Sequence, residues 1–267
     1  MEEVITITTI IQSFFIGGIL SIVFGVLGVY VLQRGLSFWG DGIAHASLAG
    51  IAVALLTGWQ PLILALIVAL LFAIGIFFLE AKTKLSKDTM IGILFTSLMS
   101  IGLLLAANLE EGHHELEAFL FGDLSEIMNF DAGVIILFSI VILGLVYKYK
   151  KELAYISIDQ QGAYMAGMPV KKLNLMFYCI LAIAVVLAAK VMGVILVSAL
   201  LIIPAAAAQL SSNSLAHWRS RSVIFSLISV IFGLIFSLFF ELPSGPVIIL
   251  TSTLLFVISL ALSKRSV

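Results

Sequence analysis

Long apolar runs alternate with short polar connections along the whole chain. A helix needs about 20 mostly apolar residues to cross the hydrocarbon core of a bilayer. About nine runs approach this length: residues 7–32, 40–57, 61–79, 89–109, 131–147, 173–189, 191–210, 222–240 and 246–262. The pattern predicts an all-α polytopic membrane protein with about eight or nine transmembrane helices. The run at 40–57 is short enough for the other helices to enclose it.

The composition also indicates a membrane protein, because 62% of the 267 residues are hydrophobic and only 11% are charged. Soluble domains are nearer half apolar and a quarter charged. No linker, low-complexity tract or clear internal repeat is present, so we expect residues 1–267 to form a single transmembrane domain. The single cysteine, Cys179, excludes an internal disulfide and a thiolate metal cluster. No basic segment precedes the first run, so we expect a retained span rather than a signal peptide.

Basic residues are distributed very unevenly between the two sets of connections. When nine spans are threaded in order, every lysine and arginine except Lys190 falls on one side. These residues are Arg34, Lys82, Lys84, Lys87, Lys148, Lys150, Lys151, Lys171, Lys172, Arg219, Arg221, Lys264 and Arg265. Cytoplasmic connections of membrane proteins carry an excess of lysine and arginine. We therefore expect this side to be cytoplasmic, with the N-terminus outside and the C-terminus in the cytoplasm.

Two ionisable residues interrupt the second run, in the stretch FWGDGIAHASL (38–48). Asp41 and His45 are four residues apart, so a helix places them on one face, one turn from each other. Counted from Arg34 along a continuous helix, they would lie about 10–16 Å into the membrane. An ionised aspartate at that depth costs a few kcal/mol and needs compensation.

The chemistry of this pair allows two interpretations. Asp41 and His45 either satisfy each other through a hydrogen bond or bind a metal ion. A carboxylate and an imidazole suit zinc, manganese or ferrous iron, and a two-fold dimer with this segment at its axis would supply four ligands. Small flanking residues permit close helix approach. They are Gly40, Gly42, Ala44, Ala46, Ser47, Ala49 and Gly50.

Five stretches resemble blocks of the membrane subunits of bacterial ABC transporters for divalent metals, the zinc, manganese and iron permease family. They are GDGIAHASLAGIAVAL (40–55), DTMIGILFTSLMSIGLLL (88–105), EAFLFGDLSEI (117–127), VMGVILVSALLIIPAAAA (191–208) and ELPSGPVIIL (241–250), in the family's order. The zinc-importing branch is the most similar, through the first, third and fourth of these stretches.

This resemblance implies a function and a set of partners. It implies that Asp41 and His45 line the translocation path and bind the transported ion, zinc by preference, with no permanently bound cofactor. It also implies a homodimer in the bacterial plasma (inner) membrane, a cytoplasmic ABC ATPase and an extracytoplasmic metal-binding protein. No nucleic-acid partner is expected.

The chain lacks the G-x-x-x-x-G-K-[ST] phosphate loop, so we expect a separate ATPase subunit to supply the energy. The longest cytoplasmic connection, residues 155–174, is the predicted docking segment. We expect a helix from Asp159, as N-cap, to Gly167, as C-terminal stop, with Gly162 allowing close packing. Ala163, Tyr164 and Gly167 would form a small apolar docking face. The residues alone fit an ordinary interfacial helix equally well, and the resemblance favours coupling to the ATPase.

The outside connection EEGHHELE (110–117) contains His113, His114 and Glu115 among further acidic residues. A loop of this kind can collect divalent cations with low affinity. The alternative is an acidic solvated loop, because adjacent histidines point to different faces of any regular element.

The leading prediction is a permease subunit of an ATP-driven metal importer, which is not itself an enzyme. A manganese or iron permease is the first alternative, because aspartate and histidine ligands do not separate these metals from zinc. An ion-coupled secondary carrier would need acidic residues in several spans, and Asp41 is nearly alone. An intramembrane metalloenzyme would need more ligands in one chain, such as an H-E-x-x-H motif, which the sequence lacks.

Overall fold

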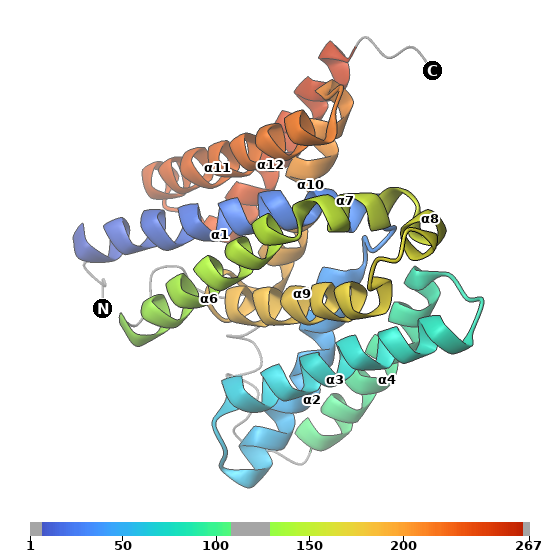
Figure 1. Ribbon diagram of the computed structural model, residues 1–267. Coiled ribbons are helices and arrows are strands. Elements are labelled where there is room, and N and C mark those ends of the chain that lie inside the picture. Colours follow the sequence, from blue (N-terminus) through green and yellow to red (C-terminus); the bar gives the residue numbers. More distant parts are fainter. Residues whose placement is uncertain (1–6, 108–128, 264–267) are drawn as a thin grey trace.

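The computed structural model describes residues 7–107 and 129–263, and both ranges are helical apart from short turns. Figure 1 shows the arrangement of the helices. They are α1 (Ile7–Gln33), α2 (Trp39–Thr57), α3 (Pro61–Lys82), α4 (Lys87–Ala106), α6 (Asn129–Lys148), α7 (Lys150–Ile158), α8 (Gln160–Met165), α9 (Val170–Met192), α10 (Val194–Ser211), α11 (Leu215–Phe240) and α12 (Ser244–Leu262). The described ranges contain no strand, which agrees with the predicted all-α class.

Eight helices of the described ranges are long and apolar enough to span a membrane. The remaining predicted run, 131–147, forms α6. The chain bends by 67° between α6 and α7, and the two together would make one further, broken span. The prediction of eight or nine transmembrane helices is therefore confirmed. The bend at Tyr149 separates apolar α6 from α7, whose sequence KKELAYISI is much more polar.

The helices form two groups, and α9 joins them (Figure 1). Helices α1, α10 and α11 contact one another, and α12 packs on α10 and α11. Helices α2, α3 and α4 form the second group. Helix α9 packs against α3 and α2 on one side and against α10 and α6 on the other. The two groups are thus joined through α9 and through the direct contact of α2 with α10.

The short helix α2 is one of the most enclosed in the bundle. In its most apolar stretch 67% of residues are buried, whereas the share is 28% for α3, 22% for α4 and 17% for α12. It packs against α3, α4, α9 and α10. The expectation that the other helices enclose the second run is confirmed. The outer helices expose apolar side chains, which suits surfaces in contact with lipid.

Glycines of α2 allow its neighbours to approach closely. A Cβ atom added at Gly50 would lie 2.5 Å from the carbonyl oxygen of Leu64 and 2.8 Å from the amide nitrogen of Ala65, both in α3. At Gly40 it would lie 3.0 Å from Ser198 Oγ of α10. The small residues do serve close helix approach. However, Gly40 and Gly50 meet helices of the same chain, not a dimer axis, because a helix with four neighbours needs small residues on several faces.

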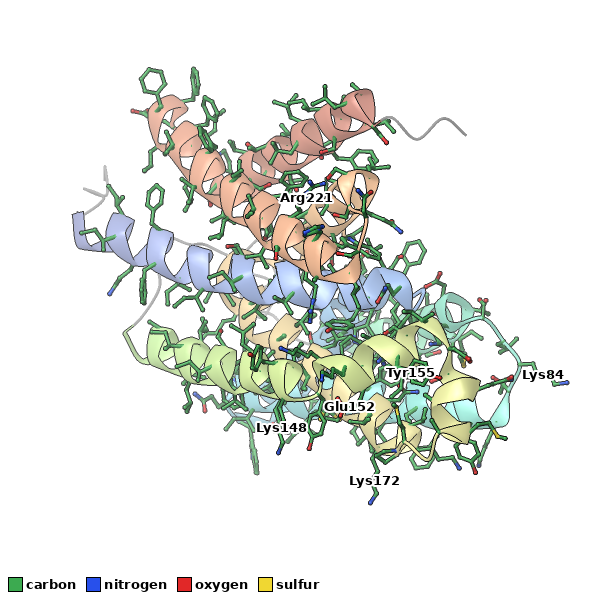
Figure 2. All side chains as sticks on the ribbon, turned by 45° about the horizontal axis from the view of Figure 1, so that its top comes forward. Lys84, Lys148, Glu152, Tyr155, Lys172 and Arg221 are labelled. Carbon is green, nitrogen blue, oxygen red and sulfur yellow. The ribbon has the colours of Figure 1, made fainter. Side chains whose placement is uncertain are left out.

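Basic connections gather at one end of the bundle, as the charge pattern predicts. Figure 1 places α8, the α3–α4 connection and the start of α9 at this end. Lys84 and Lys172 project from the same end in Figure 2. Helix α1 begins at the opposite end, whereas α12 finishes on the same side as α8 (Figure 1). A chain whose first and last helices have their free ends on opposite sides crosses the membrane an odd number of times.

We expect Gly50→Ala to lower the free energy of unfolding by about 1–3 kcal/mol, because the new methyl group must push apart the backbones of α2 and α3. Gly92→Ala in α4 is the matched control, since a Cβ there meets nothing within 4 Å. Thermal unfolding of each purified variant in detergent measures its stability relative to the unsubstituted protein. Equal unfolding temperatures for the two variants would contradict the close contact at Gly50.

Candidate functional site

Asp41 and His45 both lie near the start of α2. The helix begins at Trp39, so Asp41 is in its first turn and His45 is one turn further along. The positive end of the helix dipole favours a carboxylate at this position. Residues 34–38 form a turn between α1 and α2. The assumption of a continuous helix from Arg34 is therefore wrong, and the depth that it gave for the pair does not hold.

The two side chains do not satisfy each other. His45 Nδ1 is buried and has no hydrogen-bond partner among the described residues, and no ion pair within them joins the imidazole to Asp41. The imidazole lies 5.8 Å from the ring of Phe95 in α4, centroid to centroid. A buried polar atom without a partner costs about 1–3 kcal/mol. The geometry therefore argues against the internal hydrogen bond and leaves a nitrogen available for a ligand.

The described residues bring few metal ligands together. Among the residues that the structure describes, no group of three or more His, Cys, Asp or Glu side chains could hold a metal ion. Asp41 and His45 thus form a two-ligand face. A carboxylate oxygen and an imidazole nitrogen fit zinc, manganese and ferrous iron, but zinc sites commonly have four ligands. Further ligands would come from water, from another chain or from the part of this chain outside the described residues.

A second polar cluster, which the sequence analysis missed, lies beside the start of α2. Tyr178 of α9 donates a hydrogen bond to Glu80 of α3 over 2.7 Å, and Lys87 Nζ of α4 lies 3.5 Å from the other carboxylate oxygen. Trp39 is fully buried, with its ring 4.6 Å from that of Tyr178. The one signal in the sequence is a glutamate near the end of the apolar run FFLEAK (77–82). Nothing in the sequence pairs it with a tyrosine about 100 residues away.

The predicted cytoplasmic helix is present as α8. Asp159 is its N-cap, and its Oδ1 accepts a hydrogen bond from Gly162 N over 2.8 Å. A Cβ atom at Gly162 would overlap the Asp159 carboxylate. After the helix, Gly167 has a φ of 78°, a left-handed conformation that favours glycine. The predicted caps and the close approach at Gly162 are confirmed; the coupling role remains a prediction.

Ala163 does not lie on the outer face of α8, and this part of the prediction is wrong. Its side chain is fully buried among Ile156, Val170 and Leu173 of α7 and α9. The outer face instead carries Tyr164 and Met165, which are 67% and 84% exposed. A six-residue helix is too short for its sequence to indicate which face is buried, because no apolar period can repeat within it.

The possible collecting residues His113, His114 and Glu115 lie outside the described residues. The low-affinity cation loop therefore stays a prediction.

Similarity to known proteins extends over nearly the whole chain. Residues 6–263 match the ABC 3 transport family. The chain is 34% identical over 244 residues to the manganese transport system membrane protein MntC of Listeria monocytogenes, which covers 91% of this chain and 87% of that protein. It is 31% identical over 249 residues to the high-affinity zinc uptake system membrane protein ZnuB of Haemophilus influenzae, with coverages of 93% and 95%.

The fold is also similar to a solved structure, PsaBC from Streptococcus pneumoniae in complex with Fab. The TM-score is 0.82 at 30% identity, over 95% of this chain and 91% of that chain. The names of the two sequence relatives differ in the metal, at similar identity, so they do not separate zinc from manganese. The resemblance found in the sequence is confirmed at the level of the family. The chain belongs to the ABC 3 transport family.

Proposed function

We propose that this chain is the permease subunit of an ATP-driven importer of divalent metal ions, zinc by preference, in the bacterial plasma membrane. The observation that carries the proposal is the pair Asp41 and His45, with a buried unpartnered imidazole nitrogen in an enclosed helix. Membership of an ABC transport family and relatives named for zinc and manganese support the same class. ATP hydrolysis belongs to a separate subunit, so the permease is not itself an enzyme.

A two-ligand face suits an ion that must be released as well as bound. Transport sites need binding that is favourable enough for the ion to enter and weak enough for it to leave. In a homodimer with this face at the two-fold axis, two copies of Asp41 and His45 would make a four-ligand set, and separation of the faces would release the ion. The metal is the cargo of this site, and the donor set suits manganese and iron as well as zinc.

Energy enters from the cytoplasmic end in this proposal. An ABC ATPase docks on the exposed side chains of α8, Tyr164 and Met165, together with Ile158 at the end of α7, which is 74% exposed. ATP binding and hydrolysis bias the permease between outward-open and inward-open states. An extracytoplasmic metal-binding protein delivers the ion on the opposite side.

An ion-coupled secondary carrier fits the structure less well. Glu80, beside the start of α2, has its two carboxylate oxygens engaged by Tyr178 and Lys87. A carboxylate that binds and releases a coupling ion needs a free oxygen in at least one state. ATP-dependent uptake, as opposed to uptake driven by an ion gradient, separates the two classes.

We expect Asp41→Asn and His45→Ala each to lower metal uptake at least tenfold, since even outer-shell changes at metal sites cost about 10–100-fold in affinity. Uptake of radioactive zinc and of manganese by proteoliposomes holding the complete transporter measures the effect and the metal preference. Ser47→Ala is the matched control, because its buried hydroxyl bonds only to Ala44 O of the same helix. Normal zinc and manganese uptake by both site variants would refute the proposal.

Orientation can be read from two connections of similar length. In a variant lacking Cys179, we expect Leu85→Cys, between α3 and α4, to react with an impermeant thiol reagent only from the cytoplasm. Trp59→Cys, between α2 and α3, should react only from outside. The two native side chains are 49% and 64% exposed. The reverse labelling would show that the basic end of the bundle faces out.

The outer face of α8 offers a test of ATPase docking. We expect Tyr164→Asp to weaken association with the ATPase at least tenfold, because exposed aromatic anchors commonly contribute about 2 kcal/mol or more to an interface. Tyr164→Phe keeps the ring and should retain association. Co-purification and ATP-driven uptake measure the loss, with zinc binding to the isolated permease unchanged. Full association of the Tyr164→Asp variant with the ATPase would show that the docking surface lies elsewhere on the cytoplasmic end of the permease.

A further inference from the structure

Arg34 is a buried arginine that ties the end of α1 to the cytoplasmic elements. Only 8% of its surface is exposed. Its Nε donates a hydrogen bond to Ser157 Oγ over 2.8 Å, Nη1 to Asn174 Oδ1 over 3.0 Å and Nη2 to Leu153 O over 3.3 Å. The guanidinium carbon lies 4.4 Å from the ring centroid of Phe177. One side chain thereby joins α1 to α7 and α9.

The partners of this guanidinium are all neutral. They are a hydroxyl, an amide oxygen and a backbone carbonyl, and no carboxylate within the described residues forms an ion pair with Arg34. Burial lowers the pKa of Arg34 to about 10, so the group stays charged at neutral pH. A buried charge is expensive, and an apolar side chain of similar volume often serves stability as well. Packing alone therefore does not account for an arginine at this position.

A tight turn connects Arg34 to the start of α2. Gly35, with a φ of 63°, follows directly, and Leu36 N donates to Val31 O over 3.0 Å. Trp39 N then donates to Leu36 O over 3.0 Å. These hydrogen bonds fix the backbone between the end of α1 and the first turn of α2, which contains Asp41. A displacement applied to Arg34 would reach this turn directly.

The other end of the connection is α8. Ser157, which accepts from Arg34, lies two residues before Asp159, the N-cap of α8. Figure 2 labels Glu152 and Tyr155 of α7, the helix that carries Ser157. A pocket of about 160 Å³ lies at this junction, lined by Arg34, Ser157, Gln160 and Asn174 among others. Because α7, α8 and α9 also pack together through Ile156, Ala163, Val170 and Leu173, a displacement of α8 reaches α7.

We propose that Arg34 is a positioning residue that transmits movement of α7 and α8 to the start of α2. This inference rests on the proposed function of the Asp41 and His45 pair. When the ATPase displaces α8, the hydrogen bonds to Leu153 and Ser157 carry the displacement to the turn before α2 and shift the pair. The donor is an ionised guanidinium, so these bonds are stronger than bonds between neutral groups and can carry the displacement.

The test is the number of ions moved per ATP hydrolysed by the complete transporter in proteoliposomes, with zinc alone and then manganese alone. Coupling between sites is typically worth about 5–150-fold, so we expect Arg34→Met to lower this ratio at least fivefold. ATP hydrolysis, co-purification of the ATPase and zinc binding should persist. Arg34→Lys keeps the charge but not the three-way hydrogen bonding, and should restore the ratio only in part.

Arg219→Met is the matched control. Arg219 Nη1 also donates to α1, to the hydroxyl of Tyr30 over 3.0 Å, but from α11. We expect this variant to keep the normal ratio. If Arg34→Met does not fold, Ser157→Ala combined with Asn174→Ala removes two of the acceptors and should lower the ratio in the same way.

An unchanged ratio in the variants that fold would overturn the role of Arg34, and so would full restoration by lysine. A loss of uptake that only follows a loss of ATPase association would also overturn it, because it indicates a docking role. A wild-type transporter that moves neither zinc nor manganese would instead refute the proposed function.

Discussion

Lipid cannot solvate Asp41 or His45, so α2 must be shielded from the bilayer by protein. Four helices provide this shield, and their close approach requires small residues such as Gly40 and Gly50 on different faces of α2. The same requirement divides the bundle into enclosed helices and outer helices whose apolar side chains remain uncovered. The polar pair therefore requires the glycines, which let the neighbouring helices enclose α2, and the enclosing helices in turn form the lipid-facing surface.

Much of this arrangement could be predicted from sequence. The helices are recognisable because each needs a run of apolar residues close to the thickness of a membrane, and the basic residues mark one end of the bundle. The caps of α8 were also predictable, since an aspartate N-cap and a glycine with positive φ act within a few residues of each other. The pairing of Asp41 with His45 was visible for the same reason: one helical turn brings them together.

The rest depends on contacts that no local pattern records. Tyr178 meets Glu80, and Arg34 meets Asn174, across separations of 98 and 140 residues. Helix α7 was not predicted, because the fifth apolar run ends at residue 147 and the polar sequence KKELAYISI has no long apolar run of its own. The burial of Ala163 depends on how α8 rests on α7 and α9. The metal itself cannot be derived, since zinc and manganese accept the same two ligand types.

The two-ligand face formed by Asp41 and His45 in the described part of the chain has a thermodynamic consequence for the proposed homodimer. If a full coordination sphere needs Asp41 and His45 from both chains, the ion binds the dimer more tightly than the monomer. Linkage then requires the ion to strengthen association of the chains by the same factor. Subunit assembly in the membrane becomes sensitive to the concentration of free metal, and scarcity of the cargo loosens the contact through which that cargo must pass.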